Sequence, residues 1–141
     1  MLRVALIGAG RGGSALLPIL LGYKDLRLIG IAEINPKAPG LAIARRLEIP
    51  ITRDFRKLLD QPDLDVVIDV TRNPAVAKQL KRLKRPGLEI IGGLSAKLFW
   101  DLIQDRDRKA AELQTLNSSL EQKEGLLHQI HVLVSQGRRR L

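Results

Sequence analysis

The chain contains no cysteine, two histidines and few aromatic residues. Without cysteine it has no disulfide framework, no thiolate metal site and no thiol nucleophile. Aromatic residues make up 3% of the sequence, so the stacking surfaces on which single-stranded nucleic acids bind are scarce. No apolar run approaches the roughly 18 to 20 residues that cross a bilayer, and Met1 leads directly into a strand pattern without a signal-peptide pattern. We therefore expect no membrane span and a cytoplasmic location.

The formal net charge is +9, and the positive charge is concentrated in two runs. One run holds five basic residues without an intervening acid: Lys78, Lys81, Arg82, Lys84 and Arg85. The other, Arg138–Arg140, stands next to the last residue. A basic run of this kind is either a solvated helix face or a contact surface for an anionic partner such as nucleic acid. Both interpretations stay open at this point.

Strand-length apolar runs alternate with helix-length segments over the first two thirds of the chain. The expected strands are 3–7, 26–32, 48–52, 64–70 and 88–93, and the expected helices are 14–21, 41–47, 55–59 and 74–83. Short turns join them, which is typical of a parallel sheet covered by helices on both faces. The sequence therefore predicts an α/β fold, a Rossmann-like doubly wound parallel sheet, over residues 1–95.

The character of the chain changes from Ser95 onward, where no further strand pattern is present. We expect a helical extension over residues 96–141. Its apolar residues recur every seven positions, and a second set follows three residues later: Leu113, Leu120, Leu127 and Val134, then Leu116, Lys123 and Ile130. This pattern predicts either a coiled coil that joins two copies into a homodimer, or a long helix packed on its own sheet.

A glycine-rich turn follows the first expected strand. Gly8, Gly10 and Gly13 fit G-x-G-x-x-G, with Arg11 and Gly12 in the same turn. The first glycine permits a tight turn, the second leaves room for a pyrophosphate, and the third lets helix and strand pack closely. The free N–H groups at the start of the next helix attract phosphate. We expect all five residues to contribute to a dinucleotide site.

Acidic and polar residues stand at the ends of the later strands. Glu33 follows the last motif glycine by about 20 residues, where an acid accepts the adenosine ribose hydroxyls and favours NAD over NADP. Thr71 and Asn73 follow the fourth strand and Gly92 the fifth, so we expect them beside the same cofactor. Each of these residues is equally compatible with ordinary loop, cap or surface chemistry.

Several segments together resemble the N-terminal dinucleotide-binding domain of oxidoreductases that include homoserine dehydrogenase, dihydrodipicolinate reductase and the glucose–fructose oxidoreductase type. These segments are VALIGAGRGG, LIGIAEINP, DVVIDVTRNP and IIGG, and the resemblance covers roughly residues 1–95. The turn GRGG and the segment IGGLSA also resemble the sensory N-terminal domains of some bacterial histidine kinases and response regulators. That second resemblance implies a helix joining the domain to a downstream signalling partner.

The sequence offers no catalytic residue and no metal site. Dehydrogenases of the first group carry a second, substrate-binding domain, for which this chain has no room. His128 and His131 lie three residues apart without a nearby acid or thiol, which makes a poor metal site. We expect a non-catalytic NAD(H)-binding domain that passes cofactor occupancy to a helical dimer. The alternatives are an NAD(P)-dependent oxidoreductase domain completed by another chain, and a basic module that binds nucleic acid.

Overall fold

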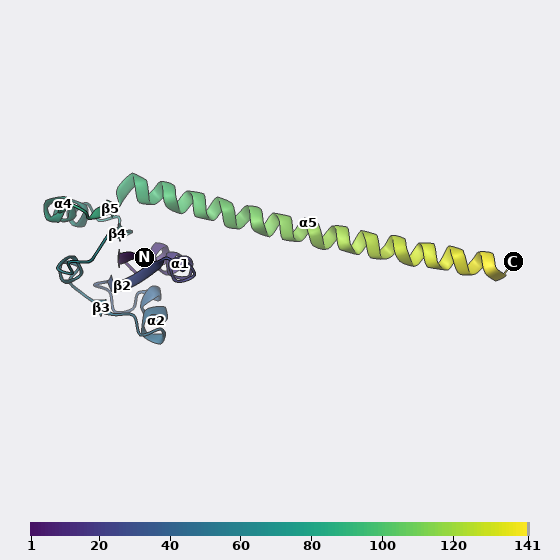
Figure 1. Ribbon diagram of the computed structural model, residues 1–141, viewed down its shortest axis with the longest axis horizontal. Helices are drawn as coiled ribbons and strands as arrows, with labels where there is room; N and C mark the ends of the chain where they lie inside the picture. The colour runs from purple at the N-terminus through teal and green to yellow at the C-terminus, as the bar shows by residue number, and fades with distance from the viewer. Residues whose placement is uncertain (141) are drawn as a thin grey trace. The chain divides into compact units, whose positions relative to one another are not determined.

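The structure, a computed structural model, describes the backbone of residues 1–140 and the side chains of residues 1–137. The side chains of the basic run Arg138–Arg140 lie outside the described residues. The elements, in chain order, are β1 (Leu2–Ile7), α1 (Arg11–Leu21), β2 (Leu26–Ala32), α2 (Pro39–Arg46), β3 (Ile51–Thr52), α3 (Arg56–Leu59), β4 (Val66–Asp69), α4 (Pro74–Leu83), β5 (Glu89–Ile91) and α5 (Gly93–Arg140) (Figure 1).

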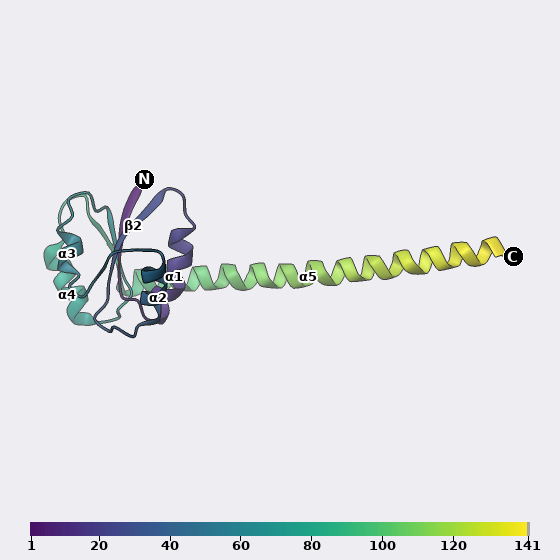
Figure 2. The ribbon, with the colours of Figure 1, turned by 90° about the horizontal axis from the view of Figure 1, so that it is seen from below.

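The five strands form one sheet with the order β3-β2-β1-β4-β5, and every neighbouring pair is parallel. Helices α1 and α2 lie on one side of the sheet and α3 and α4 on the other (Figure 2). The chain winds outward from β1 in both directions, which confirms the expected doubly wound fold. The expected strands 48–52 and 64–70 are shorter in the structure, at Ile51–Thr52 and Val66–Asp69.

The strand register brings the carboxyl ends of the strands to one edge. Ile7 pairs with Ala32 on one side and with Asp69 on the other, and Ala32 pairs with Thr52. The residues that follow these strands therefore meet at the same edge: Gly8, Glu33, Arg53 and Val70. In open parallel sheets this is the edge at which ligands bind, at the point where the winding reverses.

The apolar core lies on both faces of the sheet. Leu6, Ile31 and Val67 are fully buried in the strands, and Leu17 and Leu80 cover them from α1 and α4. Gly30 in β2 lets α3 approach, because a Cβ there would lie 2.6 Å from Leu58 Cδ2.

The chain divides into two compact units, Met1–Trp100 and the part from Asp101 onward. Helix α5 begins within the first unit and is unbroken to residue 140, although Ser118, Ser119 and Gly125 are weak helix formers. The helix therefore begins at Gly93, earlier than the expected extension 96–141. Among the described residues, no helix combines the length and apolar character needed to cross a membrane.

Candidate dinucleotide site

The turn between β1 and α1 is built around two glycines that the backbone requires. Gly8 has φ +102°, a conformation that side-chain-bearing residues rarely adopt. A Cβ at Gly13 would lie 2.1 Å from the carbonyl oxygen of Gly8, far inside contact distance. Gly13 thus permits the first turn of α1 to sit against the end of β1, as the motif predicts.

Gly10 differs from both, because nothing in the protein requires a glycine there. Its φ is −72°, and a Cβ would have no atom within 4 Å. Gly10 also lines a cavity at the carboxyl edge of the sheet. No side chain caps α1, so the N–H groups of its first turn have no side-chain acceptor. The turn is an open cradle of backbone donors, and a side chain at Gly10 would fill it.

Glu33 ties this turn to the end of β2. Its Oε1 accepts a hydrogen bond from Ala9 N at 2.9 Å, and its Oε2 accepts from Ile34 N at 2.9 Å and from Asn35 N at 3.3 Å. A carboxylate offers about four acceptor positions, so roughly one remains for a ligand hydroxyl. The structure thus gives Glu33 a role as an anchor of the loop, beside the ligand role that the sequence predicts.

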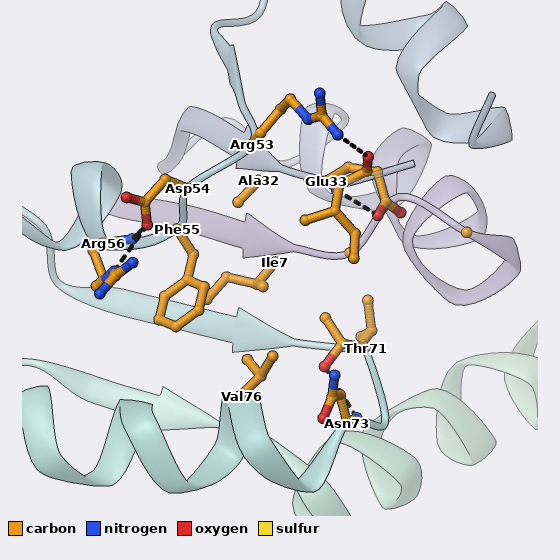
Figure 3. A pocket seen from close by; sticks show the side chains of 14 residues that line it. Ile7, Ala32, Glu33, Arg53, Asp54, Phe55, Arg56, Thr71, Asn73 and Val76 are labelled. Atoms are coloured by element: carbon orange, nitrogen blue, oxygen red, sulfur yellow. Dashed lines mark hydrogen bonds and ion pairs between the residues drawn. The ribbon is translucent and has the colours of Figure 1, made fainter. Parts of the chain in front are cut away.

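The cavity at this edge of the sheet has a volume of about 540 Å³ (Figure 3). On its apolar side, Phe55 and Val76 pack against the core that contains Ile7. Its polar side carries Glu33 and Arg53 near one end and Thr71 and Asn73 near the other (Figure 3). An apolar wall with a few converging polar groups is the usual composition of a small-molecule site.

Four residues that follow β3 line the cavity and were not among the predicted site residues: Arg53, Asp54, Phe55 and Arg56. Arg53 Nη2 donates to the carbonyl of Ile34 at 3.3 Å, next to Glu33. Asp54 accepts from Arg56 Nε at 3.1 Å, and this bond holds the pKa of the Asp54 carboxyl below its usual value. The signal that could have found them is topological, since the carboxyl end of β3 lies at the same edge.

A buried carboxylate organises the loop after β4. Asp69 is 5% exposed, and its Oδ1 accepts from Thr71 N at 2.9 Å and from Thr71 Oγ1 at 2.7 Å. The same hydroxyl accepts from Asn73 N at 3.2 Å, and Asn73 Oδ1 caps α4 through Ala75 N. Arg72, between them, has φ +56°. Thr71 and Asn73 are therefore held at the cavity by a chain of hydrogen bonds that starts in the core.

The structure gathers five of the predicted site residues at the cavity: Gly8, Gly10, Glu33, Thr71 and Asn73. Arg11, Gly12 and Gly13 belong to the adjoining first turn of α1 but are not among the lining residues. Gly92 is not among the lining residues either, and a Cβ there would lie 3.5 Å from Asp69 Cβ. It follows β5, which pairs with β4, and α5 begins one residue later.

The basic run on and just after α4 contains both exposed and half-buried residues. Lys78, Lys81, Arg82 and Lys84 are exposed, but Arg85 is half-buried. The Arg85 guanidinium donates to the carbonyl of Leu59 and, at 2.5 Å, to that of Gln61. Arg85 therefore stabilises the turn after α3 and does not belong to a free basic surface.

No cluster of three or more metal-ligating side chains occurs among the residues that the structure describes. His128 and His131 are exposed in α5.

Comparison with known proteins identifies the first unit. The family described as dihydrodipicolinate reductase, N-terminus, matches residues 2–95. An acetaldehyde dehydrogenase from a Pseudomonas species is 36% identical over 95 residues, which are 64% of this chain and 30% of that protein. The acetaldehyde dehydrogenase of Thermus thermophilus is 30% identical over 87 residues, 60% of this chain and 28% of that protein.

Among solved structures, the myo-inositol dehydrogenase of Lactobacillus casei, in complex with NAD(H) and myo-inositol, superposes with a TM-score of 0.52 at 26% identity. The match covers 63% of this chain and 27% of that one. The chain thus spans less than a third of the length of these relatives. These matches support the prediction of an NAD-type cofactor. Because the family match covers most of the chain, this protein belongs to the family of the dihydrodipicolinate reductase N-terminal domain.

Proposed function

We propose that the chain binds NAD(H) at the carboxyl edge of its sheet and acts as a non-catalytic regulatory domain. Gly10 carries the cofactor part of this proposal. Neither its backbone conformation nor its protein neighbours require glycine, whereas a bound pyrophosphate would require the space beside it. The uncapped N-terminus of α1 supplies donors and a favourable dipole for the phosphates. The residues present therefore fit a dinucleotide.

The proposed orientation of the cofactor follows from the charges around the cavity. Glu33 would accept one ribose hydroxyl of the adenosine with its remaining acceptor position, and its negative charge disfavours a 2′-phosphate. Arg53, whose Nη2 donates to the carbonyl of Ile34 next to Glu33, reduces that penalty. We expect NAD(H) to bind more tightly than NADP(H). Thr71 and Asn73 would contact the other half of the cofactor, whose nicotinamide carries a transferable hydride.

The proposal that the domain is non-catalytic rests on the titratable groups that line the cavity. They are Glu33, Arg53, Asp54 and Arg56. Glu33 is held by three backbone amides, and Asp54 is paired with Arg56. Neither carboxylate is a free acid or base that faces a substrate. A proton-transfer residue would have to come from another domain or chain.

A short series of neighbouring residues between the cavity and the start of α5 supports a regulatory role. Thr71 lines the cavity, Asp69 holds Thr71, and Gly92, immediately before α5, lies close enough to Asp69 that an added Cβ would be 3.5 Å from its Cβ. A ligand that prefers one arrangement of Thr71 would shift the position of Asp69 and hence of the start of α5. In this proposal α5 pairs two copies and relays cofactor occupancy to a downstream partner, as the resemblance to sensory domains implies.

The second candidate is an oxidoreductase domain whose substrate site is completed by another chain. It is supported by the names of the relatives, which are dehydrogenases, and by the short share of their length that this chain spans. The experiment that separates the two is a titration with NADH followed by an assay of NAD reduction with acetaldehyde and with myo-inositol. Tight binding without turnover supports the regulatory proposal, whereas steady turnover by the purified chain supports the second candidate.

A further inference from the structure

The part of α5 beyond Asp101 carries an apolar seam at heptad spacing. With Leu113 at position a, the a positions are 106, 113, 120, 127 and 134, and the d positions are 109, 116, 123 and 130. Six of these side chains are apolar and between 49% and 66% exposed: Leu113, Leu116, Leu120, Leu127, Ile130 and Val134. An exposed stripe of this length is typical of a helix that packs against another helix.

Three core positions of the seam hold basic residues, Arg106, Lys109 and Lys123. Buried positive charges lower the stability of a helix pair unless an acid lies beside each of them. Lys109 has its acid within the same helix, since its Nζ lies 3.0 Å from Asp105 Oδ2. Arg106 and Lys123 form no ion pair within residues 1–137, whose side chains are described. If these two residues are buried in a helix pair, the acids beside them would come from the second helix.

Coiled-coil geometry places an acid of a second copy beside each of these two residues. In a parallel pair in register, a residue at a packs against the partner's g residue one position earlier, and a residue at d packs against the partner's e residue one position later. Arg106 is at a and the residue before it is Asp105, which already pairs with Arg108 and Lys109 of its own helix, while Lys123 is at d and the residue after it is Glu124. We propose that α5 joins two copies of this chain as a parallel, in-register coiled coil, with Lys123–Glu124 pairs between the copies and with Asp105 shared between its own helix and Arg106 of the second copy.

The two-fold symmetry of such a pair makes each contact twice, so the surface is complementary to itself. The same register places each core residue opposite its own copy, so Lys123 lies beside Lys123 of the second copy and Arg106 beside Arg106. The acids Glu124 and Asp105 of the second copy offset this repulsion. An antiparallel pair is also two-fold symmetric, but it places d residues opposite a residues, and the a residues from 113 to 134 are leucine or valine. The acids beside the two cations, rather than the symmetry, carry the assignment of the parallel arrangement.

This inference specifies the helical pair in the proposed function, but its test does not depend on cofactor binding. Because the full chain has no cysteine, single-cysteine variants report the arrangement directly. We would make Leu113→Cys and Ile130→Cys in the full chain, oxidise each alone and as an equimolar mixture, and analyse the disulfides. The two positions are about 26 Å apart along a helix, so cross-links between them cannot form in a parallel in-register pair.

The expected result is efficient self-cross-linking of both variants and only 113–113 and 130–130 disulfides in the mixture. A predominance of 113–130 disulfides, or no self-cross-linking of either variant, would overturn the proposal in favour of an antiparallel pair. A monomer in sedimentation equilibrium of the unsubstituted chain, with native circular dichroism, would overturn it altogether.

A charge exchange tests the role of Lys123 separately. Lys123→Glu places like charges beside Glu124 of the second copy, and we expect about a tenfold rise in the dimer dissociation constant. The double variant Lys123→Glu with Glu124→Lys restores the pair and should recover the original constant. Gln122→Glu, which lies off the seam, is the control and should leave the constant unchanged. Failure of the double variant to recover would contradict the proposed contact.

Discussion

If the turn between β1 and α1 holds a dinucleotide, the same added methyl group should affect stability and NADH affinity differently at Gly13, Gly10 and Gly12. In Gly13→Ala, the new Cβ would lie 2.1 Å from a backbone carbonyl oxygen that cannot move without displacing the end of β1. We expect a loss of about 3 kcal/mol or more in the free energy of unfolding. For a domain of this size that corresponds to a fall of more than about 10 °C in Tm.

Gly10→Ala should leave the fold intact and weaken cofactor binding. The added Cβ meets no protein atom within 4 Å, and its φ of −72° is ordinary for alanine. Because Gly10 is the N-cap residue of α1 and alanine is a poorer N-cap than glycine, Tm is expected to fall by no more than a few degrees. The methyl group would occupy the space proposed for the pyrophosphate, and we expect the Kd for NADH to rise by about tenfold or more, equivalent to about 1.4 kcal/mol.

Gly12→Ala is the matched control, two residues away in the same turn. Its Cβ would lie 3.7 Å from Val70 Cβ, an ordinary van der Waals contact outside the cavity lining. The backbone N–H groups are retained, so binding should be unaffected, and alanine stabilises the helix by about 0.5 to 1 kcal/mol relative to glycine. Calorimetry of all three variants with NADH, alongside thermal melts, tests the pattern. Equal NADH affinity in Gly10→Ala and in the unsubstituted chain would refute the reasoning.

The remaining predictions concern the anchors of the site. Glu33→Ala should lower the NADH affinity, and it should lower the free energy of unfolding by about 2 kcal/mol because three backbone donors lose their acceptor. The loss of stability appears as a lower Tm, and an unchanged Tm would contradict the anchoring role. Asp69→Asn should leave NADH affinity within a few-fold but alter the protection of residues 93–100 against hydrogen exchange when NADH binds, and an identical response would remove the proposed link to α5. Arg85→Lys should lower Tm through the loss of its paired contacts to Leu59 and Gln61, whereas Lys81→Ala should not. The hydrogen bond from Lys109 lowers the pKa of Asp105 below its ordinary value of 3.8. The stabilisation of α5 by this carboxylate is therefore present above that pH and lost as the pH falls through the lowered pKa. A difference in helix melting between the unsubstituted chain and Asp105→Asn should therefore vanish in strong acid, and its persistence there would contradict the assignment.

The sequence predicted the layers of the fold because its periodicities are strong and local. The apolar run at 26–32 coincides with β2, and Asn73-Pro74 marks the start of α4 through the cap that the structure contains. The ends of β3 and β4 were less predictable. Residues 48–50 are apolar enough for a strand, but Glu48 has φ +56°, and pairing with β2 begins only at Ile51.

The candidate site was predictable where a motif fixes a backbone shape and not where side chains from distant segments meet. Gly8 and Gly13 follow from the turn itself, whereas Arg53 and Phe55 reach the cavity only through the position of β3 in the sheet. Gly92 follows β5 but does not line the cavity, since strand order and register decide which loop residue faces it. The continuity of α5 through Gly125 likewise exceeds what local propensity predicts.

The central claim is that the cavity at the carboxyl edge of the sheet is a working NAD(H) site. Isothermal titration of the purified chain with NAD, NADH, NADP and NADPH tests it most directly. The account predicts one site per chain with micromolar affinity for NAD or NADH and weaker binding of the 2′-phosphorylated forms. An absence of heat with all four dinucleotides, from a protein whose circular dichroism shows the folded α/β domain, would contradict it.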